Sequence, residues 1–248
     1  FLLFLHPTRA EVTKLEPTPI SNFPAHLMRG KMGEAANQVL EDYTLSHQRK
    51  SAFQSTPRVY KYLWSRLPLA SDMIRVLKFG KYKIASSSNG SYTIDTGTGV
   101  KGRFWLLYDG DGQKILYGEG GYSGWLIRNL SGRTLVSMSY NPIREKEGII
   151  MRNRMTVLVK IDNVVVDFLV KALNWIIRVK VRSQLDRASS SAQKLTEIIA
   201  KTPEKAYKKL RASSLIPQSI LNEYRHFFLS ERNVFSFPSR TLIAPLPT

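Results

Sequence analysis

Glycine-rich segments supply the first candidates for chemistry in this chain. Residues 97–102 read Gly-Thr-Gly-Val-Lys-Gly, which is the glycine pattern of a dinucleotide-binding loop. Such a loop needs a helix directly after it, because the helix N-terminus receives the pyrophosphate. The residues that follow, Arg-Phe-Trp-Leu-Leu-Tyr at 103–108, are instead typical of a strand. We therefore interpret the segment as a glycine-rich bend or bulge and not as a nucleotide site.

Two other apparent motifs lack a residue that their chemistry requires. The Asp-Gly-Asp-Gly segment at 109–112 begins like a calcium loop, but Gln113 and Lys114 take the next ligand region and no glutamate closes the loop. Residues 121–125 fail the nucleophile-elbow pattern, because Trp125 occupies the position of the second glycine. The first of these segments is better explained as a hairpin turn.

The sequence also offers no clear set of residues for acid–base catalysis or for metal binding. The chain has no cysteine, and none of its histidines stands at metal-ligand spacing from another: His6, His26, His47 and His226. Glu119 has no second carboxylate or histidine that the sequence can place beside it, so a surface contact with Arg103 or Arg128 is the simpler interpretation. The sequence leans toward a protein without catalytic activity, leaves that question open, and predicts no cofactor and no metal.

The charge of the chain indicates what kind of partner it would attract. Its 37 basic and 19 acidic residues give a net charge of +18, spread along the whole sequence. Such a field favours an anionic membrane surface, nucleic acid or an acidic protein, although it also serves solubility alone. Within residues 163–201, Lys171, Arg178 and Arg182 fall on one line of a helix beside Trp175, which makes them candidates for contact with an anionic surface. The alternative is an ordinary solvated helix face.

Two observations concern membranes and export. The most apolar later stretch, residues 164–181, contains four charged side chains, so we predict no transmembrane segment. Residues 1–10 have the character of the end of a signal peptide, with Thr8 and Ala10 at the small-residue positions before cleavage. On that interpretation the protein is exported or periplasmic; the lack of cysteine selects no compartment.

The elements that would position any site change character along the chain. Residues 57–67 and 71–77 are expected to be short helices, the second with Ser71 as its N-cap. Residues 78–161 contain short strands separated by turns such as Asn89-Gly90 and Asp109–Gly112, which predicts an antiparallel meander. From residue 163 to about residue 201 the spacing of apolar residues becomes helical. The apolar residues from Val165 to Val179 fall on one face of that predicted helix.

These elements divide the chain into three predicted parts. Residues 1–56 form an N-terminal arm with a short helix, residues 57–201 the main domain, and residues 202–248 a helical extension with an extended tail. Within the main domain, Gly118, Gly120 and Gly124 share one strand face. Glycine weakens strands, so this row indicates strong sheet curvature or a close approach of the long helix, either of which would leave room for a ligand.

The predicted fold class is α+β, with a curved antiparallel sheet packed against a long C-terminal helix and with arms at both ends. The order of elements over residues 57–201 resembles the START/polyketide-cyclase superfamily, also called SRPBCC or helix-grip proteins. The resemblance includes the short helices at 57–77 and the run Lys-Ile-Asp-Asn-Val-Val-Val-Asp-Phe-Leu-Val-Lys-Ala-Leu-Asn-Trp at 160–175. That resemblance implies a domain that holds an apolar small molecule or lipid between sheet and helix. Several members of the superfamily are enzymes, but no acid–base pair or nucleophile emerges from this sequence, so our first interpretation is non-enzymatic binding. Strand and helix periods place the candidate ligand site as follows: Tyr122, Met138, Tyr140, Met155, Phe168, Ala172 and Trp175.

A second interpretation takes the arms and the charge as the main features. The chain would then be a basic structural subunit of a large assembly, such as a ribonucleoprotein or a membrane complex, and its arms would wrap around partners.

Overall fold

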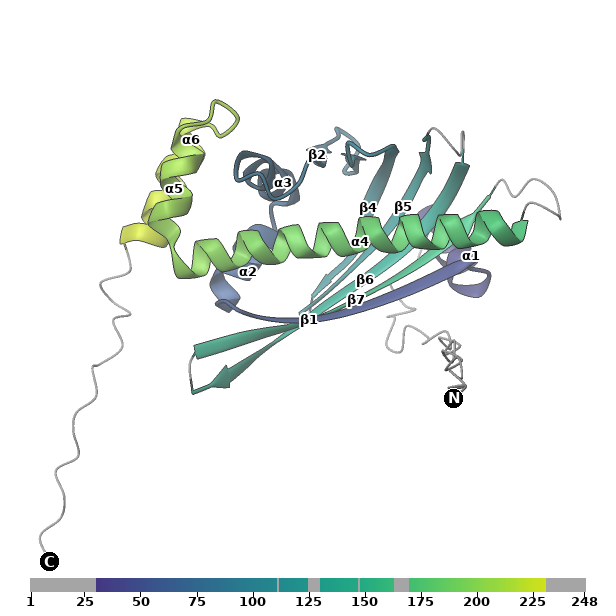
Figure 1. Ribbon diagram of the computed structural model, residues 1–248, viewed down its shortest axis with the longest axis horizontal. Coiled ribbons are helices and arrows are strands. Elements are labelled where there is room, and N and C mark those ends of the chain that lie inside the picture. Colours follow the sequence, from purple (N-terminus) through teal and green to yellow (C-terminus); the bar gives the residue numbers. More distant parts are fainter. Residues whose placement is uncertain (1–29, 111, 125–129, 147, 163–169, 231–248) are drawn as a thin grey trace, which may run out of the picture.

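The computed structural model describes residues 30–230, except residues 111, 125–129, 147 and 163–169, and at residues 30 and 170–177 it describes only the backbone. Within this part of the chain, seven strands form one antiparallel sheet in the order β1-β7-β6-β5-β4-β3-β2. The long helix α4 (Val170–Lys201) runs along this curved sheet (Figure 1). The predicted fold class, an α+β helix-grip, is confirmed. The strands are β1 (Leu45–Gln54), β2 (Lys83–Ser86), β3 (Tyr92–Asp95), β4 (Val100–Gly110), β5 (Gln113–Tyr122), β6 (Leu130–Glu145) and β7 (Gly148–Ile161).

The strands from β2 to β7 follow one another as the predicted meander. Gly90 and Gly112 have φ angles of 75° and 70°, which the tight β2–β3 and β4–β5 hairpins require. The segment that resembles a dinucleotide loop forms the β3–β4 connection and the start of β4, where Thr96 N donates to Val100 O over 3.0 Å. The segment that resembles a calcium loop is the β4–β5 hairpin, as predicted.

The edge strand β1 was not expected, because its residues lie in the segment assigned to the N-terminal arm. It pairs antiparallel with β7 from Leu45 opposite Val159 to Gln54 opposite Ile150. Its middle reads His-Gln-Arg-Lys-Ser, and only Leu45 and Phe53 are buried apolar residues. A strand with polar residues on both faces gives almost no period-two signal.

The helices largely follow the predicted positions. They are α1 (Gly30–Glu41), α2 (Pro57–Trp64), α3 (Leu67–Val76), α4, α5 (Pro203–Arg211) and α6 (Gln218–Tyr224), which a π-helical turn extends over Arg225–Leu229. Thr56 caps α2 by accepting a hydrogen bond from Val59 N, and Pro57 occupies the first turn.

The prediction that Ser71 begins a helix is wrong. Arg66 is the residue before α3, Pro68 lies in its first turn, and Ser71 is buried inside the helix. Its hydroxyl donates to Pro68 O over 2.8 Å and accepts from Ile84 N over 3.0 Å. The hydroxyl therefore satisfies a backbone amide of β2, the outermost strand on that side of the sheet.

A row of three glycines creases the sheet. Gly102, Gly120 and Gly132 stand opposite one another on β4, β5 and β6. A Cβ at these positions would lie 2.5 Å from Glu119 O, 2.5 Å from Lys101 O and 2.7 Å from Lys160 O, respectively. The neighbouring backbones approach so closely that side chains are excluded, which supports curvature as the reason for Gly120. The prediction that Gly124 shares this strand face is wrong, because β5 ends at Tyr122.

The two faces of the sheet are covered differently. The outer face carries Tyr117, Leu135 and Leu158, which are buried under Ala36 and Val39 of α1. The inner face, which α4 overlies, carries Tyr122, Leu130 and Val159, and these pack against Val181 of α4.

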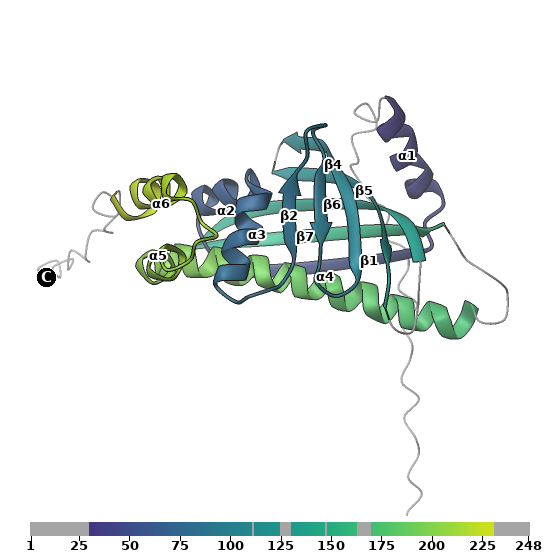
Figure 2. The ribbon, with the colours of Figure 1, turned by 90° about the horizontal axis from the view of Figure 1, so that it is seen from above.

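The largest apolar cluster lies at one end of the sheet and is mainly helical. It joins α2 and α3 to the C-terminal half of α4 and to α5 and α6, with Met73, Leu195, Ile199, Leu210 and Tyr224 almost fully buried. Figure 2 shows these helices gathered at one end, with α1 at the other. The boundaries 1–56, 57–201 and 202–248 stay predictions, although α5 and α6 share this cluster with the main domain.

The predicted apolar stripe of the long helix is corrected at its described end. Val179 is 48% exposed, and Val181 instead packs toward the sheet. The other residues of the predicted stripe, Val165 to Ile176, lie outside the residues whose side chains the structure describes.

Candidate ligand-binding site

The inner face of the sheet carries the candidate site. The register of the strands arranges its side chains in rows that run across neighbouring strands. Met138 stands between Lys114 and Met155, and Arg49 of β1 completes that row. The next row contains Leu106, Leu116, Val136 and Val157. The row after it contains Phe104, Gly118, Thr134 and Val159, so its middle positions are small. The inner face is therefore mainly apolar, except in the Met138 row, where Asp109 of β4 stands opposite Lys114 at one end and Arg49 lies at the other.

Several of these apolar side chains are not buried by the described residues. Leu106 is 37% exposed, and Phe104, Val136, Met138 and Met155 are half-buried. They also lie outside the apolar clusters that the described residues form. The outer face is different, because Ile115, Tyr117 and Leu135 there are at most 1% exposed. In the described part of the chain, the inner face thus retains apolar surface that its own residues do not cover.

The predicted ligand-binding residues fall into three groups. Met138 and Met155 are cross-strand neighbours on the inner face. Tyr122 belongs to the cluster with Val181 of α4, whereas Tyr140 packs against α2. Phe168 and the side chains of Ala172 and Trp175 lie outside the described residues, so the seven-residue site stays a prediction.

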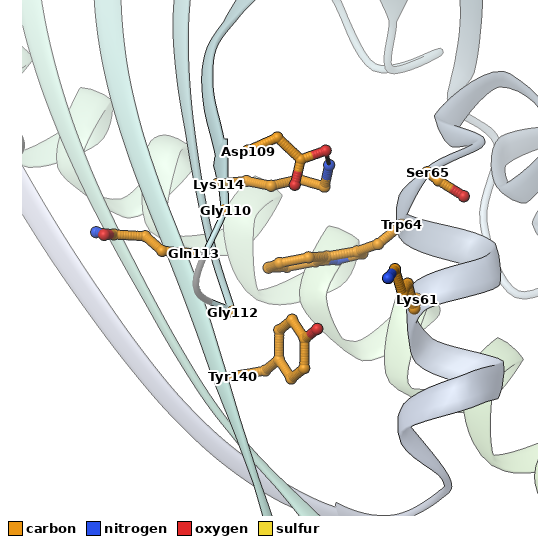
Figure 3. A pocket seen from close by; sticks show the side chains of 9 residues that line it. All are labelled: Lys61, Trp64, Ser65, Asp109, Gly110, Gly112, Gln113, Lys114 and Tyr140. Carbon is orange, nitrogen blue, oxygen red and sulfur yellow. Dashed lines mark hydrogen bonds and ion pairs between the residues drawn. The ribbon is translucent and has the colours of Figure 1, made fainter. Parts of the chain in front are cut away.

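A pocket of about 290 Å³ lies at the α2 end of the inner face, a size just below the usual range for ligand pockets. One wall is the C-terminal part of α2, with Lys61, Trp64 and Ser65. The opposite wall is the β4–β5 hairpin with Asp109 and Lys114, and Tyr140 of β6 lies at the base. Figure 3 shows the Trp64 ring between the Asp109–Lys114 pair and Tyr140, with the side chain of Gln113 directed away.

Aromatic contacts hold the apolar part of this pocket in place. The ring centroids of Trp64 and Tyr140 are 5.3 Å apart with an edge-to-face angle of 89°, and Tyr60 lies 4.7 Å from each of them. Burial raises the pKa of Tyr60, and the neighbouring Tyr140 raises it further. Tyr60 is therefore a neutral phenol that supports the other two rings.

Lys114 is the most buried charged group of the pocket. Its side chain is 5% exposed, and its ammonium pairs with the carboxylate of Asp109, whose side chain is 52% exposed. The ammonium also lies 5.9 Å from the centre of the Trp64 ring. Lys61, on the opposite wall, is exposed.

Of the residues that line this pocket, the sequence predicted only Tyr140 as a ligand contact. Lys114 shares its strand face with Leu116 and Gly118, so a lysine on an otherwise apolar face was the available signal. Its position beside Trp64 depends on the path of α2 across the hairpin, which no local period encodes.

A polar group joins α4 to the edge strand beside Met155. Arg49 donates to Asp186 Oδ1 over 2.7 Å and to Ser190 Oγ over 3.1 Å, and His47 Nε2 lies 3.5 Å from the same Asp186 oxygen. Partial burial raises the pKa of Asp186, but the Arg49 hydrogen bond and charge, together with His47, outweigh burial and hold that pKa below its ordinary value.

The other predicted contacts remain on the surface or outside the described residues. Arg178 and Arg182 are exposed on α4, and the side chain of Lys171 lies outside the described residues, so contact with an anionic surface stays a prediction. Glu119 is exposed, stands opposite Arg103 in the β4–β5 ladder and accepts a hydrogen bond from the Tyr117 hydroxyl over 2.8 Å. In the described residues no three His, Asp or Glu side chains gather as metal ligands would. None of the described helices has the length and hydropathy to cross a membrane.

Comparison with known proteins finds similarity only among solved structures. Neither a protein-family model nor a curated protein matches the sequence. A conserved protein from Geobacillus kaustophilus is 10% identical with a TM-score of 0.42, over 62% of this chain and 97% of that one. A START superfamily protein from Mycobacterium smegmatis is 10% identical with a TM-score of 0.40, over 62% of this chain and 99% of that one. A protein from Chromobacterium violaceum is 12% identical with a TM-score of 0.35, over 61% and 97%.

Matches at this level assign neither ligand nor activity to the present chain. The order of the strands and the position of α4 nevertheless agree with the family that the sequence suggested. The resemblance to the START/polyketide-cyclase superfamily is therefore confirmed as a likeness of fold.

Proposed function

We propose that this protein binds a hydrophobic, lipid-like ligand between the inner face of the sheet and α4, without catalysing its conversion. The observation that carries the proposal is the uncovered apolar surface of the inner face, where Phe104, Leu106, Val136, Met138 and Met155 are half-buried or exposed. Apolar surface of this kind gains free energy when a ligand removes it from water. Gly118 and Thr134 keep the middle of that face shallow.

Native mass spectrometry of the gently purified protein, followed by solvent extraction, tests whether an apolar molecule copurifies. Titration with the neutral fluorescent probe N-phenyl-1-naphthylamine then measures binding directly. The double variant Met138→Gln/Met155→Gln should bind the probe about tenfold more weakly, because each amide loses hydrogen bonds to water beneath the ligand.

Arg154→Gln is the matched control. Arg154 neighbours Met155 on β7 but is exposed on the outer face, so this variant should bind the probe as the unmodified protein does. A protein that carries no apolar molecule and does not bind the probe would refute the proposal. Equal weakening by both variants would place the probe elsewhere.

A second candidate function, a basic structural subunit of a large assembly, is favoured by α5. This helix exposes Lys205, Lys208, Lys209 and Arg211 and contains Glu204 as its single acidic residue. Light scattering coupled to size-exclusion chromatography at low and high salt separates the candidates. Salt-sensitive complexes with an anionic partner would support the assembly role, whereas a monomer loaded with ligand would support the first proposal.

A further inference from the structure

The pocket beside α2 has features that apolar ligand binding alone does not require. A lysine side chain that is 5% exposed lies on an otherwise apolar strand face. Moving an ammonium group out of water is costly, and that cost is met only by good partners. The partners that the described residues give Lys114 are one carboxylate, which itself is half in solvent, and the ring of Trp64.

The geometry leaves room at this ammonium for another anion. An ammonium carries three N–H donors, and Asp109 uses one of them. Lys114 lines the pocket of about 290 Å³, so its other two N–H donors are available to a ligand there. Lys61 adds a second ammonium group from the opposite wall.

We propose that this pocket binds the carboxylate of an amphipathic monoanion whose apolar part lies on the inner face of the sheet. This inference rests on the proposed function and adds the class of head group. Lys114 makes the main contact with the carboxylate, Lys61 supplies additional positive potential, and Trp64 and Tyr140 contact the first apolar atoms of the ligand.

The charges of the lining favour a monoanion. Lys61 and Lys114 contribute two positive charges and Asp109 one negative charge, so the side chains of the pocket sum to +1. A single carboxylate neutralises that charge. A phosphate dianion would leave an excess negative charge next to Asp109, and like charges in close contact are unfavourable.

Strand register places the pocket next to the apolar surface. Met138 stands directly opposite Lys114 in the β5–β6 ladder and lies two residues from Tyr140 on the same face of β6. Met155 follows on β7. An alkyl chain attached to a carboxylate at Lys114 therefore extends over both methionines.

Isothermal titration calorimetry with three probes of equal chain length tests the inference. Dodecanoate, dodecan-1-ol and dodecyl phosphate are each titrated below their aggregation concentrations at neutral pH. Dodecanoate should bind about tenfold or more tightly than dodecan-1-ol, because a hydrogen bond to a charged group in a buried site contributes at least that factor. Dodecyl phosphate should bind more weakly than dodecanoate.

Variants then assign the preference to its residues. Lys114→Met should reduce dodecanoate affinity to that of dodecan-1-ol and leave the alcohol within about twofold, because the shape of the side chain is retained. Asp109→Asn should increase dodecanoate affinity several-fold, since it removes the competing carboxylate. Lys50→Met is the control, because Lys50 is exposed on the outer face of β1 and should affect neither probe.

The possible outcomes separate the carboxylate site from the proposed function. Equal affinity for dodecanoate and dodecan-1-ol leaves the proposed function intact and overturns the carboxylate site. Binding of neither probe overturns both. Tighter binding of dodecyl phosphate overturns the choice of a monoanion. If Lys114→Met melts at a much lower temperature, Asp109→Asn decides: no gain in dodecanoate affinity overturns the site.

Discussion

Replacing Gly120 with alanine is expected to open the crease of the sheet. The new Cβ would lie 2.5 Å from Lys101 O and 2.9 Å from Gly102 Cα, both backbone atoms of the neighbouring strand. Neither atom can rotate away, so β4 and β5 must separate. Overpacking of this kind costs up to about 3 kcal/mol, and the loss of glycine's flexibility returns about 0.5–1 kcal/mol. We expect the free energy of unfolding to fall by about 2 kcal/mol.

Gly118 provides a matched control on the same strand and the same face. A Cβ there would first meet the Thr134 methyl at 2.9 Å, and its nearest backbone atom, Arg103 O, lies at 3.4 Å. The methyl belongs to a side chain and can shift, although a full rotation would break the 3.0 Å hydrogen bond from Thr134 Oγ1 to Leu158 O. Gly118→Ala should therefore lower the free energy of unfolding by about 1 kcal/mol at most.

Urea unfolding followed by circular dichroism measures both variants, with the midpoint and the m value fitted separately. Gly102→Ala should cost about as much as Gly120→Ala, and the double variant should cost less than the sum, because the strands need to separate only once. Equal stability of Gly118→Ala and Gly120→Ala would refute the reasoning that a backbone contact creates the crease. A flattened sheet should also weaken N-phenyl-1-naphthylamine binding.

Three further predictions concern other elements. Lys78 has φ = 60° at the end of α3, where Lys78 N donates to Arg75 O and Phe79 N to Ile74 O, so Lys78→Gly should raise the free energy of unfolding by about 0.5–1 kcal/mol in the same urea assay. Thr56→Ala removes the acceptor that caps Val59 N over 3.2 Å and should lower it by about 1 kcal/mol. The pKa of Asp186 is lower in the folded protein than its ordinary value, so its contribution to stability is present above that value and is lost as pH falls through the folded pKa. Asp186→Asn should therefore flatten the acid side of a stability–pH curve, and an unchanged acid slope would contradict this.

The sequence predicted those elements whose local pattern matches their tertiary role. The Asn89-Gly90 and Asp109–Gly112 turns mark the β2–β3 and β4–β5 hairpins, as the sequence indicated. β1 was missed because an edge strand whose middle is polar has no apolar period. Ser71 has the residue type of a helix cap, but Pro68 three residues earlier already begins the helix, and the hydroxyl serves β2 instead.

The sequence predicted which face of the sheet carries the candidate site, but not which helix packs over it. Strand alternation correctly assigned Met138, Tyr140 and Met155 to one face, because side chains two residues apart point the same way. The cover over Tyr140 is α2, through Tyr60 and Trp64, and not the long helix that the period change suggested. Which helix crosses which strand depends on connections that carry no periodic signal.

The way α4 is attached explains how apolar surface can persist beneath it. Its C-terminal half is fixed by Leu195 and Ile199 in the helical cluster, and nearer its other end Val181 contacts the sheet. Between these anchors the contact with β1 is polar, through Arg49 and Asp186. An arginine holds its partner at the length of its own side chain, whereas facing apolar residues would draw the helix toward the sheet until the space between them closed. Since Arg49 stands opposite Met155, the polar bridge borders the proposed ligand surface and keeps the helix at a fixed height above it.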